Sequence, residues 1–327
     1  MLTRKLGSTG PEVSALGLGC MAMSGMYGPS DEAESISTIH AAIDQGITLL
    51  DTGDFYGMWH NELLIGRALH GRRNQVLLSV KFGAMRAPDG AFIGVDARPQ
   101  SVKNFLSYTL QRLGTDHIDI YRPARVDPSV PIEDTVGAIA DLIKAGYVRY
   151  AALSEASAET AKRANATHPI CDLQIEYSII SRSIEENILP ALRLRGIGVT
   201  AYGVLSRGLL CGSRPGGNGD FRAHLPRFAG ANFDRNTALL NAFNAIAHEK
   251  GVTPSQLAIA WVLARGEQIV PLIGSRKRTQ LTEALGALRV RLSADDLARI
   301  DRAVPDAGIV GTRYDEHQMR MLDSERV

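Results

Sequence analysis

The chain has 327 residues, of which 45% are hydrophobic and 22% are charged, a composition typical of a globular protein with a sizeable core rather than of a disordered one. Its 36 Lys and Arg side chains balance 35 Asp and Glu side chains, so net charge gives no general attraction to nucleic acid or to an anionic membrane. No segment has the ~18 apolar residues of a transmembrane helix, and the first residues lack the apolar stretch of a signal peptide, so we expect a cytoplasmic protein.

Strand-like and helix-like segments alternate from the N-terminus onward. Residues 2–14 predict a small β-hairpin, because Gly7 and Gly10-Pro11 break short apolar segments there. Eight later segments have the apolar, β-branched character of buried strands: 15–20, 47–51, 76–81, 117–121, 148–153, 172–176, 198–202 and 268–273.

Helical patterns follow most of these strands. The first helix is predicted between Asp31 and Gly46, with acidic residues in its first turn. Residues 212–219 predict a long turn-rich insertion, and the polar tail from Asp306 onward predicts an extended or partly mobile segment. The other predicted helices are 61–70, 99–113, 131–145, 158–167, 185–195, 236–250, 254–264, 278–288 and 293–303.

The alternation favours a closed (β/α)8 barrel over an open, doubly wound sheet. No Gly-x-Gly-x-x-Gly turn opens an early helix, which argues against a dinucleotide-binding domain of the Rossmann type. Composition does not shift along the chain, so we expect residues 1–327 to form one TIM-barrel domain with an N-terminal β-hairpin and extra C-terminal helices.

In a parallel barrel, the carboxyl ends of all strands and the loops after them meet at one mouth, where active sites lie. The three cysteines, Cys20, Cys171 and Cys211, are far apart, so we expect neither a disulfide framework nor a metal site. The polar and small residues predicted at the mouth are Asp51, Tyr56, Lys81, Ala124, Arg125, Ser154, Glu155, Gln174, Glu176, Tyr202 and Gly274-Ser275-Arg276.

Asp51, Lys81 and Tyr56 together predict a proton donor. A carboxylate can hold an ammonium group, and an adjacent ammonium lowers the pKa of a phenol, which would let the tyrosine act as an acid near neutral pH. Each residue alone also has a structural explanation: a helix cap or turn for Asp51, a solvated strand end for Lys81, and packing for Tyr56. Their convergence on one mouth favours the catalytic interpretation.

These motifs resemble those of the aldo-keto reductases over residues 6–303, and most closely the branch of auxin-induced and perakine-reductase-like oxidoreductases. The motifs that carry the resemblance are Asp51-Thr52-Gly53-Asp54-Phe55-Tyr56-Gly57, Lys81, Arg125-Val126-Asp127-Pro128, Gln174-Ile175-Glu176-Tyr177-Ser178 and Ile273-Gly274-Ser275-Arg276.

The resemblance implies that Tyr56 protonates a substrate carbonyl oxygen while NADPH delivers hydride to the carbon, and that Lys81 and Asp51 tune Tyr56. It also implies a small-molecule carbonyl substrate and no metal. Further residues that it implies for cofactor binding are Ser154, Glu155 and Gln174 at the carboxamide, Tyr202 under the nicotinamide, Leu205 and Arg207 along the pyrophosphate, Ser275 and Arg276 at the 2′-phosphate, and Glu283 at the adenine.

The basic run Arg276-Lys277-Arg278 favours NADPH over NADH, because a guanidinium and a hydroxyl suit a phosphomonoester dianion. The alternative is a solvated helix start, although cations in a first helical turn are unfavourable without an anion nearby.

One position departs from the family pattern. The resemblance implies a histidine directly before Arg125, to hydrogen-bond the substrate carbonyl, but Ala124 stands there. Arg122, His60 or a water could fill the gap, or the pocket could be reshaped for a different substrate. A second hypothesis is a catalytically weak, NADPH-binding relative with a redox-sensing or regulatory role.

Smaller departures affect the cofactor residues. Glu155 stands where asparagine is common, and Gln280 and Ala284 stand where arginine and asparagine are frequent near the adenine. The sequence leaves open the physiological substrate, the preferred direction and the oligomeric state.

Overall fold

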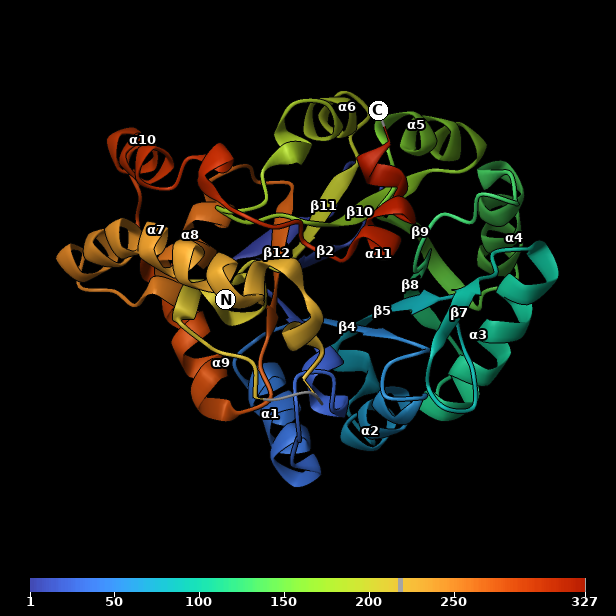
Figure 1. The fold of residues 1–327 in the computed structure, drawn as a ribbon. Helices are drawn as coiled ribbons and strands as arrows, with labels where there is room; N and C mark the ends of the chain where they lie inside the picture. The colour runs from blue at the N-terminus through green and yellow to red at the C-terminus, as the bar shows by residue number, and fades with distance from the viewer. Residues whose placement is uncertain (217–219, 327) are drawn as a thin grey trace.

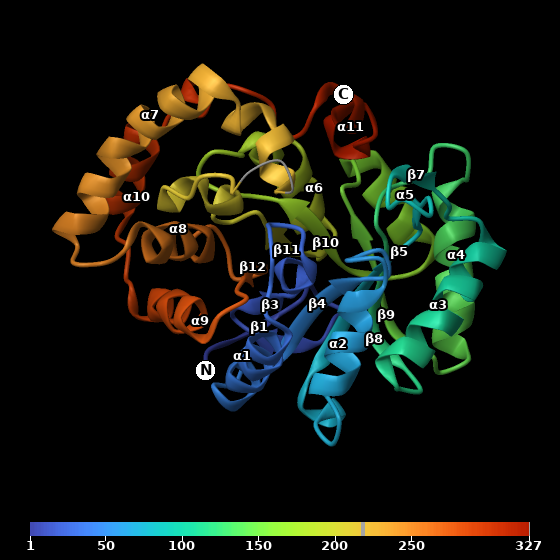
Figure 2. The same cartoon turned by 60° about the horizontal axis from the view of Figure 1, so that its bottom comes forward.

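The computed structural model describes residues 1–216 and 220–326. Its centre is a closed barrel with the strand order β10-β11-β12-β3-β4-β5-β8-β9, in which all neighbouring strands are parallel (Figures 1 and 2). The predicted (β/α)8 barrel is therefore confirmed. The barrel strands are β3 (Gly17–Gly19), β4 (Leu49–Gly53), β5 (Leu77–Phe82), β8 (Ile118–Pro123), β9 (Val148–Ser154), β10 (Ile170–Glu176), β11 (Gly198–Tyr202) and β12 (Ile269–Gly274).

Helices surround the barrel, and amphipathic patterns such as that of α4 place their apolar faces against the strands. Proline at the first position and Gly114 as a left-handed cap delimit α3. The helices are α1 (Glu32–Asp44), α2 (His60–Ala68), α3 (Pro99–Leu113), α4 (Ile132–Lys144), α5 (Ala158–Thr167), α6 (Ile188–Leu194), α7 (Gly230–Glu249), α8 (Pro254–Leu263), α9 (Arg278–Leu285), α10 (Ala294–Ala303) and α11 (Glu316–Arg320). None of them, within the described residues, combines the length and apolar character needed to cross a membrane.

The N-terminal hairpin of β1 (Thr3–Lys5) and β2 (Glu12–Ser14) closes the end of the barrel opposite the mouth. Its Leu6 and Val13 pack into a buried cluster with inward-facing strand residues such as Leu49 and Val270. The turn needs Gly7, which has a φ of +66° and whose missing Cβ would lie 2.5 Å from the Gly196 carbonyl oxygen. The hairpin thus closes this end of the barrel, and the mouth at the carboxyl ends of the strands is the expected place for chemistry.

Most predicted elements have the expected positions, but two segments differ. Helix α7 begins at Gly230 rather than at residue 236, and no side chain caps its start. The segment after β5 contains a hairpin of β6 (Ala84–Arg86) and β7 (Phe92–Val95), which no predicted strand covers. The predicted insertion at 212–219 falls partly on residues 217–219, which lie outside the described residues.

The C-terminal tail was expected to be extended or partly mobile, and this expectation is wrong. The tail contains α11, red in Figures 1 and 2, and packs beside the carboxyl end of β9. Asp323 accepts a hydrogen bond from the Ser157 backbone nitrogen at 2.8 Å, and the Ser324 nitrogen donates to the Glu155 carbonyl at 3.1 Å. Arg313 is only 7% exposed. The tail therefore forms part of the barrel mouth.

Candidate active site

The end of β4 places a carboxylate beside a lysine. β4 pairs with β5 so that Gly53 lies opposite Lys81 and Asp51 opposite Ser79. Lys81 Nζ is 2.5 Å from Asp51 Oδ2, and both side chains are buried. Ser79 Oγ and Gln174 Nε2 donate to the other carboxylate oxygen at 2.9 and 2.8 Å. Three donors hold this buried charge, which makes its position well defined.

Tyr56 lies against this pair. Its backbone nitrogen donates to the Gly53 carbonyl, and a Cβ on Gly53 would lie 3.1 Å from the Phe55 ring and 3.4 Å from the Tyr56 ring. Lys81 Nζ is 5.1 Å from the centroid of the Tyr56 ring. The Tyr56 hydroxyl makes no hydrogen bond to any described residue. The structure therefore brings the predicted trio together and leaves the phenol free to bind a ligand.

The electrostatics of Tyr56 differ from the sequence expectation. Burial is the main cause that raises the pKa of Tyr56 well above its usual value, followed by the charge of Asp51. Arg125, not Lys81, gives the leading opposing effect. Burial lowers the pKa of Lys81, and Asp51 opposes that shift. Without a cofactor the phenol thus stays protonated at neutral pH, which is the form that an acid needs.

Both residues suggested as substitutes for the missing histidine have partners of their own in the chain. Arg122 is fully buried and directs its guanidinium to Asp172 at 2.9 Å and to Ser79 at 3.0 Å. Asp172 and Ser79 precede Gln174 and Lys81 by two residues, so Arg122 occupies the layer beneath the trio. It supports Asp51 through Ser79 instead of facing a substrate.

Both ring nitrogens of His60 also have partners within the chain. It is the first residue of α2, and its Nδ1 lies 3.0 Å from Ser24 Oγ while its Nε2 lies 3.1 Å from Glu32 Oε2. At the missing histidine's own position, Ala124 is buried and offers only a methyl group.

Glu155 anchors the C-terminal tail. Arg313 donates to both of its carboxylate oxygens, at 2.9 and 2.6 Å, and Ser324 Oγ donates at 2.7 Å. The Tyr202 hydroxyl adds a further bond of 2.7 Å. Although burial opposes it, the arginine charge holds the pKa of Glu155 below its usual value. The Glu155 carboxylate is thus hydrogen-bonded by donors of the chain itself. The cation that neutralises it is Arg313 of the tail.

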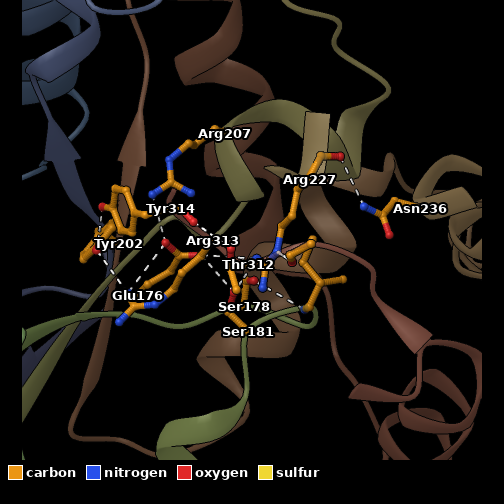
Figure 3. Close-up of polar contacts among 12 residues, drawn as sticks. Glu176, Ser178, Ser181, Tyr202, Arg207, Arg227, Asn236, Thr312, Arg313 and Tyr314 are labelled. Carbon is orange, nitrogen blue, oxygen red and sulfur yellow. Dashed lines mark hydrogen bonds and ion pairs between the residues drawn. The ribbon is translucent and has the colours of Figure 1, made fainter. Parts of the chain in front are cut away.

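A second buried carboxylate, Glu176, lies at the centre of the cluster in Figure 3. It contacts Arg207 at 3.0 Å, Arg227 at 3.4 Å and Arg313 at 3.8 Å, and it accepts a hydrogen bond from Ser181 at 2.8 Å. These contacts join the end of β10 to the loop after β11 and to the tail.

The tail also places Tyr314 over the expected cofactor side of the mouth. Its hydroxyl is 3.0 Å from the Tyr202 hydroxyl, and the Arg207 guanidinium lies 4.6 Å from the centroid of its ring. Figure 3 shows Tyr314 between these two residues. Tyr314 therefore borders the positions assigned to the nicotinamide and the pyrophosphate.

The loop after β11 has features of an anion-binding segment. Leu205 precedes Ser206 and Arg207, which adopt positive φ values of 46° and 55°, a strained backbone that is concentrated at functional sites. The buried Ser206 hydroxyl has no hydrogen-bond partner among the described residues. A phosphate oxygen would satisfy it, so this loop fits the pyrophosphate of a dinucleotide.

The predicted 2′-phosphate site lies at the end of β12. Ser275 is buried, and Arg276 Nη1 donates to the carbonyls of Tyr27 at 3.0 Å and Pro29 at 3.1 Å. The remaining guanidinium nitrogens of Arg276 have no partner among the described residues. Arg278 forms an exposed ion pair with Glu34 at 3.0 Å.

The remaining predicted cofactor residues also lie on this side of the barrel or at its mouth. Ser154 is the buried last residue of β9. Glu283 is on α9, and its backbone carbonyl accepts a hydrogen bond from Gln256 at 3.0 Å.

Asp54, between Asp51 and Tyr56, supplies a test by pH. Its Oδ2 accepts a hydrogen bond from the Gly83 nitrogen at 3.2 Å, its Oδ1 has no partner among the described residues, and burial raises its pKa to about 7. Between pH ~4 and ~7 Asp54 is therefore protonated in the folded chain and ionised in the unfolded chain. The unfolding free energy that this group contributes falls as the pH rises through this range.

Asp54→Asn removes this dependence. We expect nearly equal unfolding free energies for the two proteins at about pH 4, and a variant that is more stable by on the order of 4 kcal/mol at about pH 8. Urea denaturation at the two pH values measures the difference. A difference independent of pH would show that Asp54 is ionised throughout this range.

Sequence reasoning missed Arg313 and Tyr314, because the tail follows the last barrel strand and belongs to no strand end. The signal that pointed to them was Glu155 itself, since a buried carboxylate needs a cation. It also missed the layer formed by Arg122 and Asp172.

A groove of about 810 Å³ lies at the opposite end of the barrel, where the N-terminal hairpin meets residues such as Arg193 and Gly196. It contains none of the predicted site residues.

Comparisons with known proteins agree with this geometry. The profile of the Aldo/keto reductase family matches residues 15–305. A probable aldo-keto reductase 1 of Glycine max is 43% identical over 318 residues, which are 95% of this chain and 91% of that protein.

Solved structures show the same similarity. The glycerol dehydrogenase AKR11B4 from Gluconobacter oxydans has a TM-score of 0.84 and 27% identity, with 96% of this chain and 98% of that chain covered. The aldo-keto reductase AKR11C1 from Bacillus halodurans, in its holo form, has a TM-score of 0.78 and 27% identity, with 97% and 99% covered.

Proposed function

This chain belongs to the aldo/keto reductase family, and from that premise we propose that it reduces an aldehyde or ketone to an alcohol with NADPH, with Tyr56 as the proton donor. The observation that carries this proposal is the free hydroxyl of Tyr56 beside the buried Lys81–Asp51 pair. The family's oxidoreductase chemistry applies to the chain as a whole, whereas the choice of NADPH and the role of each residue are our inferences.

The bound nicotinamide would supply the hydride. Tyr56 would donate its proton to the carbonyl oxygen, and Lys81 would stabilise the phenolate that remains, at 5.1 Å from the ring centroid. Asp51 holds Lys81 in place and is itself held by Ser79 and Gln174. A redox-sensing relative would not need this arrangement, so the intact trio favours an enzyme over the regulatory alternative.

The chain's own residues fit a dinucleotide along the mouth. Tyr202 would lie under the nicotinamide, with Ser154 and Gln174 near the carboxamide and Glu155 fixing the Tyr202 hydroxyl. The orphaned Ser206 hydroxyl, with Leu205 and Arg207, would meet the pyrophosphate. Ser275 and the free nitrogens of Arg276 would meet the 2′-phosphate, and Glu283 would lie near the adenine.

Arg276→Ala tests the cofactor choice. We expect NADPH affinity to fall about 10- to 100-fold, because charge-assisted hydrogen bonds to the phosphate are lost, and NADH affinity to change less than about threefold. Fluorescence titration of each cofactor measures this. Arg278→Ala is the matched control, because that side chain is paired with Glu34.

Equal weakening of both cofactors by Arg276→Ala would contradict the phosphate contact. It would instead indicate that Arg276 acts through the loop at residues 27–29, whose carbonyls it holds.

The proposed function is tested by NADPH consumption with a panel of aldehydes and ketones, for the wild type and for Tyr56→Phe. Turnover that depends on Tyr56 supports it. Tight NADPH binding without turnover of any carbonyl compound would contradict the proposal that the protein is an enzyme.

A further inference from the structure

Arg125 lies at the mouth beside the proposed acid. It follows Ala124 directly after β8, its Nη1 donates to the Ala124 carbonyl at 2.7 Å, and its guanidinium is 5.8 Å from the centroid of the Tyr314 ring. It is partly buried, and it acts electrostatically on Tyr56, Tyr202 and Glu155. The side chain is therefore directed into the mouth and not toward bulk solvent.

No carboxylate among the described residues pairs with Arg125, which sets it apart from the neighbouring arginines. Those arginines are neutralised by buried acids: Arg207 and Arg227 by Glu176, and Arg313 by Glu155. A partly buried cation without an anionic partner is costly unless a ligand supplies the anion. Glu155 acts on Arg125 only from beyond ion-pair distance, so within the described residues the guanidinium has no directly paired anion.

We propose that Arg125 binds an anionic group of the substrate, so that this reductase acts on carbonyl compounds that carry a carboxylate or a phosphate. The proposal rests on the proposed function. Ala124 supports it, because the residue directly before Arg125 is buried and offers only a methyl group, so it supplies no neutral hydrogen-bond donor. A guanidinium there can form a paired hydrogen-bonded contact with either anion.

Matched substrates test this proposal. Terephthalaldehydic acid and its methyl ester have similar shape but differ in charge, and glyceraldehyde phosphate with glyceraldehyde forms the corresponding phosphate pair. We expect the wild type to prefer at least one anionic member in kcat/KM, and Arg125→Gln to lower kcat/KM for that member by about 10- to 100-fold. Values for the neutral member should change less than about threefold, and Arg125→Lys should keep part of the preference.

Arg86→Gln is the control. Arg86 also lacks a carboxylate partner among the described residues, but it packs on Phe55 and Phe92, with its guanidinium 5.8 Å from each ring centroid. We expect it to leave the charge preference unchanged. If Arg125→Gln lowered kcat/KM equally for the anionic and the neutral substrate of each pair, the proposal would be overturned. Arg125 would then be assigned to tuning Tyr56. Weakened NADPH binding would overturn it by assigning Arg125 to the cofactor.

Binding separates this inference from the proposed function. Calorimetric titration of benzoate and benzamide into the NADP⁺-loaded wild type and Arg125→Gln needs no turnover. Tighter binding of benzoate that is lost in the variant supports an anion site even if no aldehyde is reduced. Equal binding of both ligands, together with no charge preference in the phosphate pair, overturns it.

Discussion

Tyr56→Phe is expected to lower kcat for carbonyl reduction by about 10²- to 10⁴-fold and to leave NADPH affinity within about twofold. The substitution removes one oxygen atom, which makes no hydrogen bond to the described residues, so the fold loses no contact. The ring that packs on Phe55, at 4.7 Å between centroids, is kept. Steady-state rates with saturating NADPH, together with a cofactor titration, measure the two quantities.

Tyr121→Phe is the matched control for this experiment. The Tyr121 hydroxyl donates to the Val102 carbonyl at 3.0 Å, away from the mouth. Its loss should cost about 1 kcal/mol of stability and leave kcat nearly unchanged. A Tyr56→Phe protein that retained more than a tenth of wild-type kcat would assign the proton to another donor.

Lys81→Met is expected to have two large effects. It leaves Asp51 charged in a buried position with only Ser79 and Gln174 as donors, which should cost about 3 kcal/mol of unfolding free energy. It also removes the cation that would stabilise the Tyr56 phenolate, so kcat should fall about 10²-fold. Urea denaturation and steady-state rates measure the two effects.

A double variant separates these two roles of Lys81. Adding Asp51→Asn to Lys81→Met removes the uncompensated charge, so stability should recover by more than about 1 kcal/mol while kcat stays low. Recovery of kcat in the double variant, or wild-type stability in Lys81→Met, would contradict the roles proposed for this pair.

The barrel and its mouth could be predicted because their signals are local. Apolar β-branched runs give the strands, and Gly46 and Gly114, both with positive φ, mark where helices end. Parallel pairing then fixes which strand ends meet. Asp51 and Lys81 could be brought together on that basis alone.

The tail could not be predicted because its contacts are long-range. Arg313 is fixed by Glu155, 158 positions earlier in the chain, and no periodicity in the tail reports that partner. Helix α7 began earlier than predicted because its first residue is Gly230 and no side chain caps it.

The layer beneath the trio was also beyond sequence reasoning. The sequence places Arg122 near the end of a strand. Side chains alternate between the two faces of a strand, and this alternation does not say whether the guanidinium faces the mouth or turns into the barrel. Only Asp172, 2.9 Å away on β10, decides between them. The same ambiguity applied to Arg125, whose lack of a carboxylate is visible only when all its neighbours are placed.

Hydride transfer itself tests the central claim most directly. NADPH deuterated on the reactive face of C4 would be incubated with the protein and a panel of carbonyl compounds, anionic ones included, and the alcohols examined by mass spectrometry. We predict deuterium on the carbinol carbon of at least one product, formed by the wild type and not by Tyr56→Phe. Tight NADPH binding with no labelled alcohol from any carbonyl would contradict the assignment of this chain as a reductase.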